Sequence, residues 1–310
     1  MSRKGKDYLM LCAKGIGMGA ADVIPGVSGG TIAFITGIYE ELIDSIKSIN
    51  LEAVKLLLSG KIKDFWKHIN GSFLLSVFGG IFISVASLAK LIDYLLREQP
   101  VLIWAFFFGL IISSSLIVAR KITRWDLNIL IAFVIGTAAA FYITSVSPTQ
   151  TTEAAWFIFL AGAIAICAMI LPGISGSFIL LLLGKYQFAL NAVNEIRIVP
   201  LLLLGSGAVI GLISFSNLLS WLLRKYHNIT IGVLAGFMIG SLNKIWPWKE
   251  VLETVVIKDE VKPLVEKNIL PSLSNPEHHF WMAAGLCLLG IALVIFLELG
   301  LGRKKEKQPA

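Results

Sequence analysis

Six apolar segments, each close to the length that crosses a lipid bilayer, constrain the fold more than any other feature of this sequence. They cover residues 72–92, 100–119, 126–146, 198–223, 228–245 and 280–300. A helix needs about 20 apolar residues to span the hydrocarbon core of a bilayer. Hydrophobic residues make up 56% of the 310 residues and charged residues only 15%, which is too little polar surface for a soluble globule. The sequence therefore predicts an all-α polytopic membrane protein.

Two further apolar regions, 9–46 and 156–194, are interrupted in the middle. The first contains PGVSGG at residues 25–30 and the second contains PGISGS at residues 172–177. Proline cannot continue a helix and glycine permits tight turns, so each region is predicted to break there. Irregular backbone at membrane depth is tolerated only where protein, water or a ligand covers it.

The distribution of lysine and arginine predicts how the chain crosses the membrane. Basic clusters lie at the N-terminus, within 47–70, at 120–124, at 224–225 and from 303 onward. Cytoplasmic loops carry such an excess, so both termini are predicted to be cytoplasmic, whereas segment 246–279 mixes both signs and is predicted to be an external loop. Each interrupted region then begins and ends on one side of the membrane. We predict two re-entrant helical hairpins that enter from opposite faces.

An internal repeat supports this topology. A spacing of 147 residues aligns Pro25 with Pro172 and, with them, Gly15 with Gly162, Gly26 with Gly173, Ser28 with Ser175, Gly29 with Gly176, Gly37 with Gly184 and Tyr39 with Tyr186. A spacing of 127 residues aligns Gly80 with Gly207, Arg97 with Arg224 and Gly109 with Gly236.

The difference between the two spacings corresponds to an amphipathic segment at 47–70, which is predicted to lie on the cytoplasmic membrane surface. Residues 1–146 form the first predicted repeat and 147–310 the second, each with one hairpin and three spanning helices. Because three is odd, the second repeat is predicted to be inverted, as in many secondary transporters.

The hairpin tips are the predicted ligand site. Helices that start after a broken tip present backbone N–H groups, and small residues there leave room for an anion such as phosphate or carboxylate. The predicted substrate-binding residues are Asp22, Pro25, Gly26, Ser28, Gly29, Gly30, Thr31, Pro172, Gly173, Ser175, Gly176 and Ser177, with Arg97 and Arg224 at the matching helix ends. The alternatives are that the motif is only a turn for close packing, and that the two arginines are interfacial anchors.

Three acidic residues are candidates for proton coupling. Asp22 precedes the first tip and is replaced by Met169 in the second repeat, and an ionisable group at membrane depth is expensive and therefore suggests function. Its alternative role is to cap the broken helix. Glu40 and Glu41 follow the same hairpin, and either pair with a basic residue or mark the cytoplasmic interface.

Other classes of function find little support. The net charge of +7 is spread over the ends of apolar segments, so it does not predict nucleic-acid binding. The cysteines and histidines match no metal-ligand or disulfide spacing, and no cofactor is predicted.

GMGAADVIPGVSGGTIAFITGIYEELI and its second copy, CAMILPGISGSFILLLLGKYQFAL, resemble the DUF368 family of bacterial inner-membrane proteins over nearly the whole chain. The resemblance implies a transporter that returns undecaprenyl phosphate, or a related polyprenyl phosphate, from the outer to the inner leaflet. It also implies that the family motif is carried by Asp22, Pro25, Gly26, Ser28, Gly29, Gly30, Thr31, Pro172, Gly173, Ser175 and Gly176, and it assigns no individual role to them.

Two alternatives remain open at the level of sequence. A membrane polyprenyl-diphosphate phosphatase also uses duplicated broken helices, but its signature places an arginine after the serine, where this chain has Gly29 and Gly176. Export of a small organic anion is the other alternative.

Overall fold

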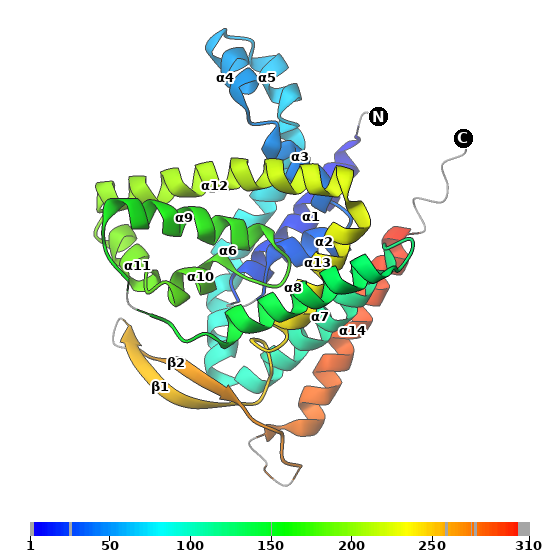
Figure 1. Ribbon diagram of the computed structural model, residues 1–310, viewed down its shortest axis with the longest axis vertical. Helices are drawn as coiled ribbons and strands as arrows, with labels where there is room; N and C mark the ends of the chain where they lie inside the picture. Colours follow the sequence, from blue (N-terminus) through cyan, green and yellow to red (C-terminus); the bar gives the residue numbers. More distant parts are fainter. Residues whose placement is uncertain are drawn as a thin grey trace.

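The protein is mostly helical, with one two-stranded sheet (Figure 1). The computed structural model describes residues 3–24, 27–149, 151–257, 260–273, 275 and 278–302. Its helices are α1 (Gly5–Asp22), α2 (Gly29–Ile35), α3 (Tyr39–Lys47), α4 (Leu51–Leu58), α5 (Ile62–His68), α6 (Gly71–Glu98), α7 (Pro100–Arg120), α8 (Leu127–Ser145), α9 (Ala155–Ile170), α10 (Gly176–Leu182), α11 (Tyr186–Asn194), α12 (Ile198–Lys225), α13 (His227–Ser241) and α14 (Phe280–Gly302). The strands are β1 (Lys249–Ile257) and β2 (Glu260–Asn268).

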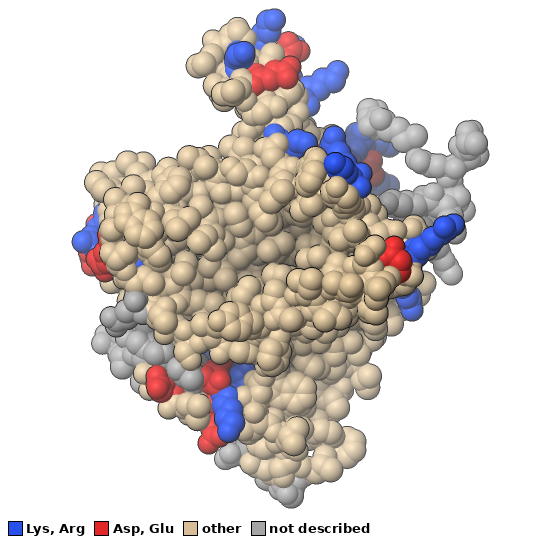
Figure 2. Space-filling view, viewed as in Figure 1, with Lys and Arg blue, Asp and Glu red and all other residues tan. Residues whose placement is uncertain are grey.

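Within the described residues, five helices are long and apolar enough to cross a membrane, namely α6, α7, α8, α12 and α14. Figure 2 shows a broad belt without charged side chains between a mainly basic zone and a zone of both signs. The sixth predicted span, 228–245, is the 15-residue helix α13. It ends early because Leu242, Asn243 and Lys244 each donate a backbone hydrogen bond three residues back, and this tightens the last turn.

The two interrupted regions do break at the predicted motifs, and each breaks a second time. Region 9–46 contains α1, α2 and α3, and region 156–194 contains α9, α10 and α11, with a bend of 110° between α10 and α11. Pro25 and Gly26 lie outside the described residues. The second breaks occur at Gly37 and Gly184, whose φ angles of 72° and 62° are left-handed. Glycine adopts that conformation without strain and ends the helix there.

The first helix of each interrupted region packs closely on a long helix, because glycines on each helix lie against backbone carbonyls of the other. In the first half, a Cβ at Gly15 would collide with the carbonyl of Val77, and one at Gly80 with that of Cys12. These contacts join α1 to α6.

The second half repeats the arrangement between α9 and α12. There, Gly162 faces the carbonyl of Leu204, and Gly207 faces that of Phe159. All four glycine contacts keep the spacings of 147 and 127 residues found in the sequence.

The remaining spans pair across the two halves of the chain. Helix α7 packs on α14, and α8 packs on α13. Gly109 of α7 faces the carbonyl of Cys287, and Gly236 of α13 faces that of Phe133. The two halves therefore share one interlocked helical body, rather than forming two separate units.

Segment 246–279 contains an antiparallel hairpin, β1–β2, and its external location stays a prediction. The all-α prediction is wrong at this point. Valine and threonine in β1 favour extended structure, and opposite charges face each other across the strands at Glu250 and Lys267.

Segment 47–70 forms the short helices α4 and α5, which project from the body as a hairpin (Figure 1). The chain reverses at Gly60, whose φ is 72°. Leu51 and Leu58 are 81% and 83% exposed. The prediction that this segment lies on a membrane surface stays a prediction.

Replacing Gly80 by alanine should destabilise the protein, whereas the same change at Gly79 should not. The new methyl group at position 80 would overlap the carbonyl of Cys12, but nothing lies within 4 Å of a Cβ at position 79. We expect a loss of about 1–3 kcal/mol for Gly80→Ala, measured by unfolding of the purified protein in detergent. Equal stability of the two variants would contradict the glycine contact.

Candidate functional site

The start of α2 is capped by residues of its own hairpin. Asp22 Oδ1 accepts a hydrogen bond of 2.7 Å from Gly29 N, and Ser28 Oγ accepts one of 3.0 Å from Gly30 N. Thr31 N donates to the carbonyl of Ser28 at 2.9 Å. The backbone donors that an anion would use are therefore occupied within the chain in this arrangement. For Asp22, this is the geometry of the capping alternative, and its roles in binding and proton coupling stay predictions.

Gly30 leaves no room for a side chain, and Gly29 lies directly against Asp22. A Cβ at Gly30 would lie 2.5 Å from the carbonyl oxygen of Ile170, which is backbone, and a Cβ at Gly29 would lie 2.5 Å from Asp22 Oδ2, which is the end of a side chain. The close approach of α2 to the second hairpin therefore depends on Gly30, whereas a side chain at position 29 would displace the Asp22 carboxylate.

The two hairpins touch each other directly. Ser28 Oγ donates to the carbonyl of Met169 at 2.9 Å, and the hydroxyl of Tyr39 donates to the carbonyl of Ile170 at 3.2 Å. Both carbonyls belong to the last turn of α9, where no further helical turn is available to pair them. The PG-x-SG motif of the first half thus lies against the residues that lead into the motif of the second half.

The second tip packs on α13. Gly173 has a φ of 98°, and a Cβ there would lie 2.7 Å from Ser241 Oγ. Ser175 caps α10 by accepting from Phe178 N at 3.3 Å, and its hydroxyl lies 3.2 Å from that of Ser177. Pro172 is buried beside them.

Thr31, one of the predicted site residues, has a buried hydroxyl that lacks a hydrogen bond within the part of the chain that the structure describes. Its side chain is fully buried, and Oγ1 has no hydrogen-bond partner among the described residues. An unsatisfied buried hydroxyl costs about 1–3 kcal/mol. Thr31 is therefore available to a new partner if the tips separate.

The charged candidates other than Asp22 lie at the periphery, and two of them, Glu41 and Arg224, form ion pairs with other parts of the chain. Arg3 makes a bidentate pair with Glu41, with both distances at 2.6 Å, and Glu40 is exposed. Arg224 pairs with Asp44 of α3 at 2.9 Å. Arg97 is exposed in the last turn of α6. The structure does not bring these side chains to the tips.

Sequence reasoning missed the acceptors on α9, because a backbone carbonyl carries no signal in side-chain patterns. It aligned Tyr39 with Tyr186 but assigned neither a role. Lys185, which from the sequence could either reach the membrane surface or bind a ligand, is 2% exposed and donates to the carbonyl of Thr151 at 2.9 Å. No group of three metal-ligating side chains occurs within the described part of the chain.

This geometry defines a class: a multi-pass helical membrane protein in which two broken-helix hairpins meet through their tips. The chain belongs to the VCA0040-like family, described as undecaprenyl phosphate translocase-like, whose model matches residues 18–262. The family resemblance found in the sequence is confirmed.

Curated relatives agree with this assignment. A protein of Vibrio cholerae serotype O1 named "Polyprenyl-phosphate transporter" is 48% identical over 303 residues, covering 96% of this chain and 98% of the relative. A protein of the same name from Staphylococcus aureus is 33% identical over 252 residues, covering 76% of this chain and 84% of the relative. No solved structure matches the chain significantly.

Tyr39→Phe should weaken the contact between the hairpins, because it removes only the hydroxyl that donates to Ile170. We expect a loss of about 1 kcal/mol in the free energy of unfolding. Tyr186→Phe is the matched control, since the hydroxyl of Tyr186 makes no hydrogen bond among the described residues. The hydrogen bond is contradicted if both variants unfold at the same denaturant concentration as the parent.

Proposed function

We propose that this protein is a transporter that moves a polyprenyl phosphate, such as undecaprenyl phosphate, across the bacterial cytoplasmic membrane. The observation that carries the proposal is the 48% identity to a polyprenyl-phosphate transporter along nearly the full length of both chains. For recycling of the carrier lipid, the direction is from the outer to the inner leaflet. The apolar belt in Figure 2 fits a substrate whose chain stays in lipid while its phosphate crosses.

The proposed architecture is an inverted repeat of residues 1–146 and 147–310. Its support is that equivalent glycines meet equivalent carbonyls in both halves, in α1–α6 and α9–α12 as well as in α7–α14 and α8–α13. Both termini lie on the cytoplasmic side in this proposal. The basic zone in Figure 2, next to α4, α5 and the N-terminus, supports that orientation.

The two halves differ at one contact, and this suggests which side is closed. Helix α3 packs along α12, where Asp44 accepts from Ser220 at 2.8 Å and Lys47 donates to Ser220 at 3.2 Å. The equivalent packing of α11 on α6 is much sparser. In the proposed transport cycle, this structure is the arrangement closed on the cytoplasmic side and looser on the external side.

The proposed path for the phosphate runs past the two tips. In the present arrangement the N–H groups of α2 bind Asp22 and Ser28, so the phosphate would compete with these caps once the tips separate. The buried hydroxyl of Thr31 supports this role, because it would gain a partner in the same step.

The phosphatase alternative is disfavoured by space as well as by sequence. A Cβ at Gly176 would lie 2.7 Å from the backbone carbonyl oxygen of Ala165, and a side chain at Gly29 would displace the Asp22 carboxylate, which lies 2.5 Å from the position of a Cβ. No observation favours export of a small organic anion over lipid transport.

The proposal is tested by leaflet transfer of a prenyl phosphate in proteoliposomes, and Asp22 can be tested in the same assay. Asp22→Asn keeps an acceptor for Gly29 N but removes the ionisable group, whereas Asp22→Ala removes both. If Asp22 couples transfer to protons, Asp22→Asn should abolish the stimulation of transfer by a pH gradient while the protein stays folded. Unchanged stimulation would exclude the proton role, and absent transfer by the parent protein would overturn the transporter proposal.

The Asp44–Arg224 pair can be tested by charge exchange. Its side chains are 47% and 66% exposed, and such pairs contribute only about 0–1 kcal/mol, so the contact can open readily. We expect Asp44→Arg and Arg224→Asp each to slow transfer, and the exchanged double variant to recover it. Failure of the exchange to recover transfer would instead favour the alternative that Arg224 binds phosphate directly.

A further inference from the structure

Two adjoining cavities lie between the β1–β2 hairpin and the ends of α8, α10 and α13, away from the tips. One is polar, measures about 330 Å³ and includes Lys244, Lys249 and Glu266 in its lining. The other is apolar, measures about 690 Å³ and is lined by α7, α8, α13 and Trp246. Asn243 and Asn268 belong to both linings. The two cavities therefore adjoin, one charged and one apolar, and the hydrogen-bonded pair Asn243 and Asn268 lies between them.

The charged end carries more positive than negative charge. Lys244 Nζ and Lys249 Nζ both bind the same oxygen of Glu266, Oε2, at 3.1 and 3.2 Å. The side chains of Lys244 and Lys249 are only 19% and 7% exposed, and that of Glu266 is 18% exposed. Lys267 adds a further positive charge to the lining. Burying two ammonium groups on one carboxylate is costly without a further anion.

The neighbouring aromatic rings hold the lysines in place. Lys249 Nζ lies 4.5 Å from the centroid of Trp104 and donates to the carbonyl of Lys244 at 2.7 Å, and Lys244 Nζ lies 5.2 Å from the centroid of Phe178. Both amines are thus fixed at the mouth of a cavity instead of extending into solvent. Such preorganisation lowers the cost of binding an anion.

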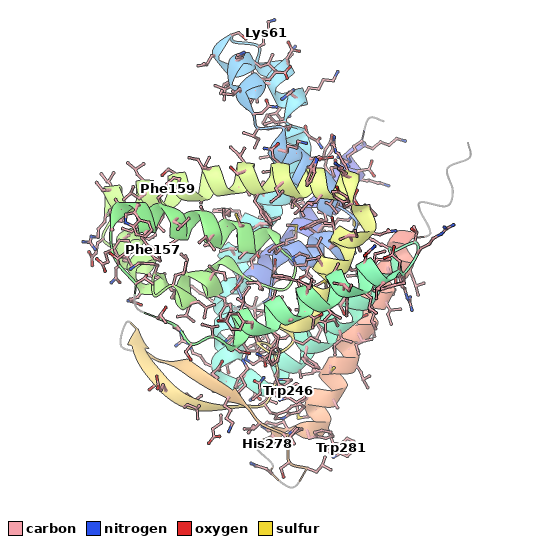
Figure 3. All side chains as sticks on the ribbon, viewed as in Figure 1. Lys61, Phe157, Phe159, Trp246, His278 and Trp281 are labelled. Atoms are coloured by element: carbon pink, nitrogen blue, oxygen red, sulfur yellow. The ribbon has the colours of Figure 1, made fainter. Side chains whose placement is uncertain are left out.

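The apolar end is open toward the lipid belt. Its lining includes Phe133 and Trp246, and the α8 residues Val134 and Phe141 are 55% and 54% exposed. Figure 3 shows Trp246 beside the β-hairpin, below the body of the helices. Trp246 is held by an edge contact with Phe108 and by donation from Nε1 to the carbonyl of Ile269 at 2.9 Å.

We propose that these adjoining cavities bind a phosphate-bearing lipid, with the phosphate on Lys244 and Lys249 and the first part of the chain passing Asn243 and Asn268 into the apolar groove along α8. The occupant is a prenyl phosphate waiting on the external face before it reaches the hairpin tips. This inference rests on the proposed transport function. It adds to that function a loading site that involves none of the motif residues.

Charge complementarity favours a phosphate monoester over a diester. A monoester carries close to two negative charges at neutral pH, and the two ammonium groups can each bind one of its oxygens. Glu266 remains ionised, because the charges and hydrogen bonds of Lys249 and Lys244 lower its pKa despite the opposing effect of burial. Its carboxylate bridges the two amines and offsets their mutual repulsion.

The site is tested by binding of farnesyl phosphate, a short prenyl phosphate, to the purified full-length protein in phosphatidylcholine nanodiscs. We expect Lys244→Gln and Lys249→Gln each to weaken binding about tenfold or more. Lys61→Gln is the matched control, since it removes the same charge at the opposite end of the molecule (Figure 3). Thermal unfolding of each variant checks that it is folded. Equal affinity of the parent and the double lysine variant would overturn the proposal.

A second variant separates the two ends of the site. Ala138 is exposed in the lining of the groove, so Ala138→Trp should fill it without disturbing the core. We expect this change to weaken farnesyl phosphate but not inorganic phosphate, whereas the lysine variants weaken both. Unchanged binding of farnesyl phosphate to Ala138→Trp would exclude the groove as the chain site.

Two comparisons distinguish this proposal from its alternatives and from the transport function. Equal binding of phosphatidylglycerol would mean that the occupant is bulk phospholipid, and this overturns the loading role. Binding without leaflet transfer would retain the site and overturn the transport function. If the parent protein transfers the prenyl phosphate, and the lysine variants bind and transport it as well as the parent does, the transport function is retained and the proposed site is overturned.

Binding should also weaken as the pH rises. Burial lowers the pKa of Lys249 to about 8, against the attraction of Glu266, so this ammonium loses its proton between pH 7 and 9. The other titratable groups that face the cavity are Lys244, Glu266 and Lys267. We expect the dissociation constant of farnesyl phosphate to rise over this pH range in the parent, and the rise to be smaller in Lys249→Gln. An identical pH profile for both proteins would contradict the role of Lys249.

Discussion

Every backbone donor and acceptor at membrane depth must find a partner within the protein, and the structure depends on how two broken helices meet this requirement. An unbroken span satisfies its backbone along its own length, but α1 and α9 end inside apolar sequence. The solution is mutual. Ser28 and Tyr39 of the first hairpin donate to the last carbonyls of α9, and Asp22 accepts from the first amide of α2. Interruption of the helices and contact between the hairpins are therefore parts of one arrangement.

Close packing of glycine against carbonyl oxygens makes that arrangement possible. With no side chain at Gly15, Gly80, Gly162 or Gly207, the long helices approach near enough to fix the positions of α1 and α9. In lipid the hydrophobic effect does not drive helices together, so their association depends on the close van der Waals packing that small residues permit. The same glycines were visible in the sequence as aligned pairs, which is why the internal repeat could be predicted, whereas the spans followed from the length of the apolar segments and the breaks from the PG-x-SG motifs.

Other features could not be predicted from the sequence. The second break at Gly37 depends on a left-handed backbone conformation, and the presence of a glycine in the sequence does not show that this conformation is adopted. The β-hairpin was not predicted because charged residues of both signs are spread irregularly between Lys249 and Asn268, as in an ordinary loop. The sharing of Glu266 by two lysines depends on the register that brings Lys249 of β1 near Glu266 of β2, and on the turn after α13 that carries Lys244. Capping by Asp22 was one of the alternatives predicted from the sequence, but the distance and partner of the cap are known only from the folded structure.

The left-handed glycines Gly37 and Gly184 limit how far either tip can travel. Each lies at the end of a seven-residue helix that begins at a tip, so α2 and α10 are rigid rods about 10 Å long between two joints. The hydrocarbon core is about 30 Å thick. One rod that swings about its glycine covers only part of that distance, and the two rods end to end still fall short. On the proposed path past the tips, a headgroup would pass from one rod to the other while its own chain slides through the lipid.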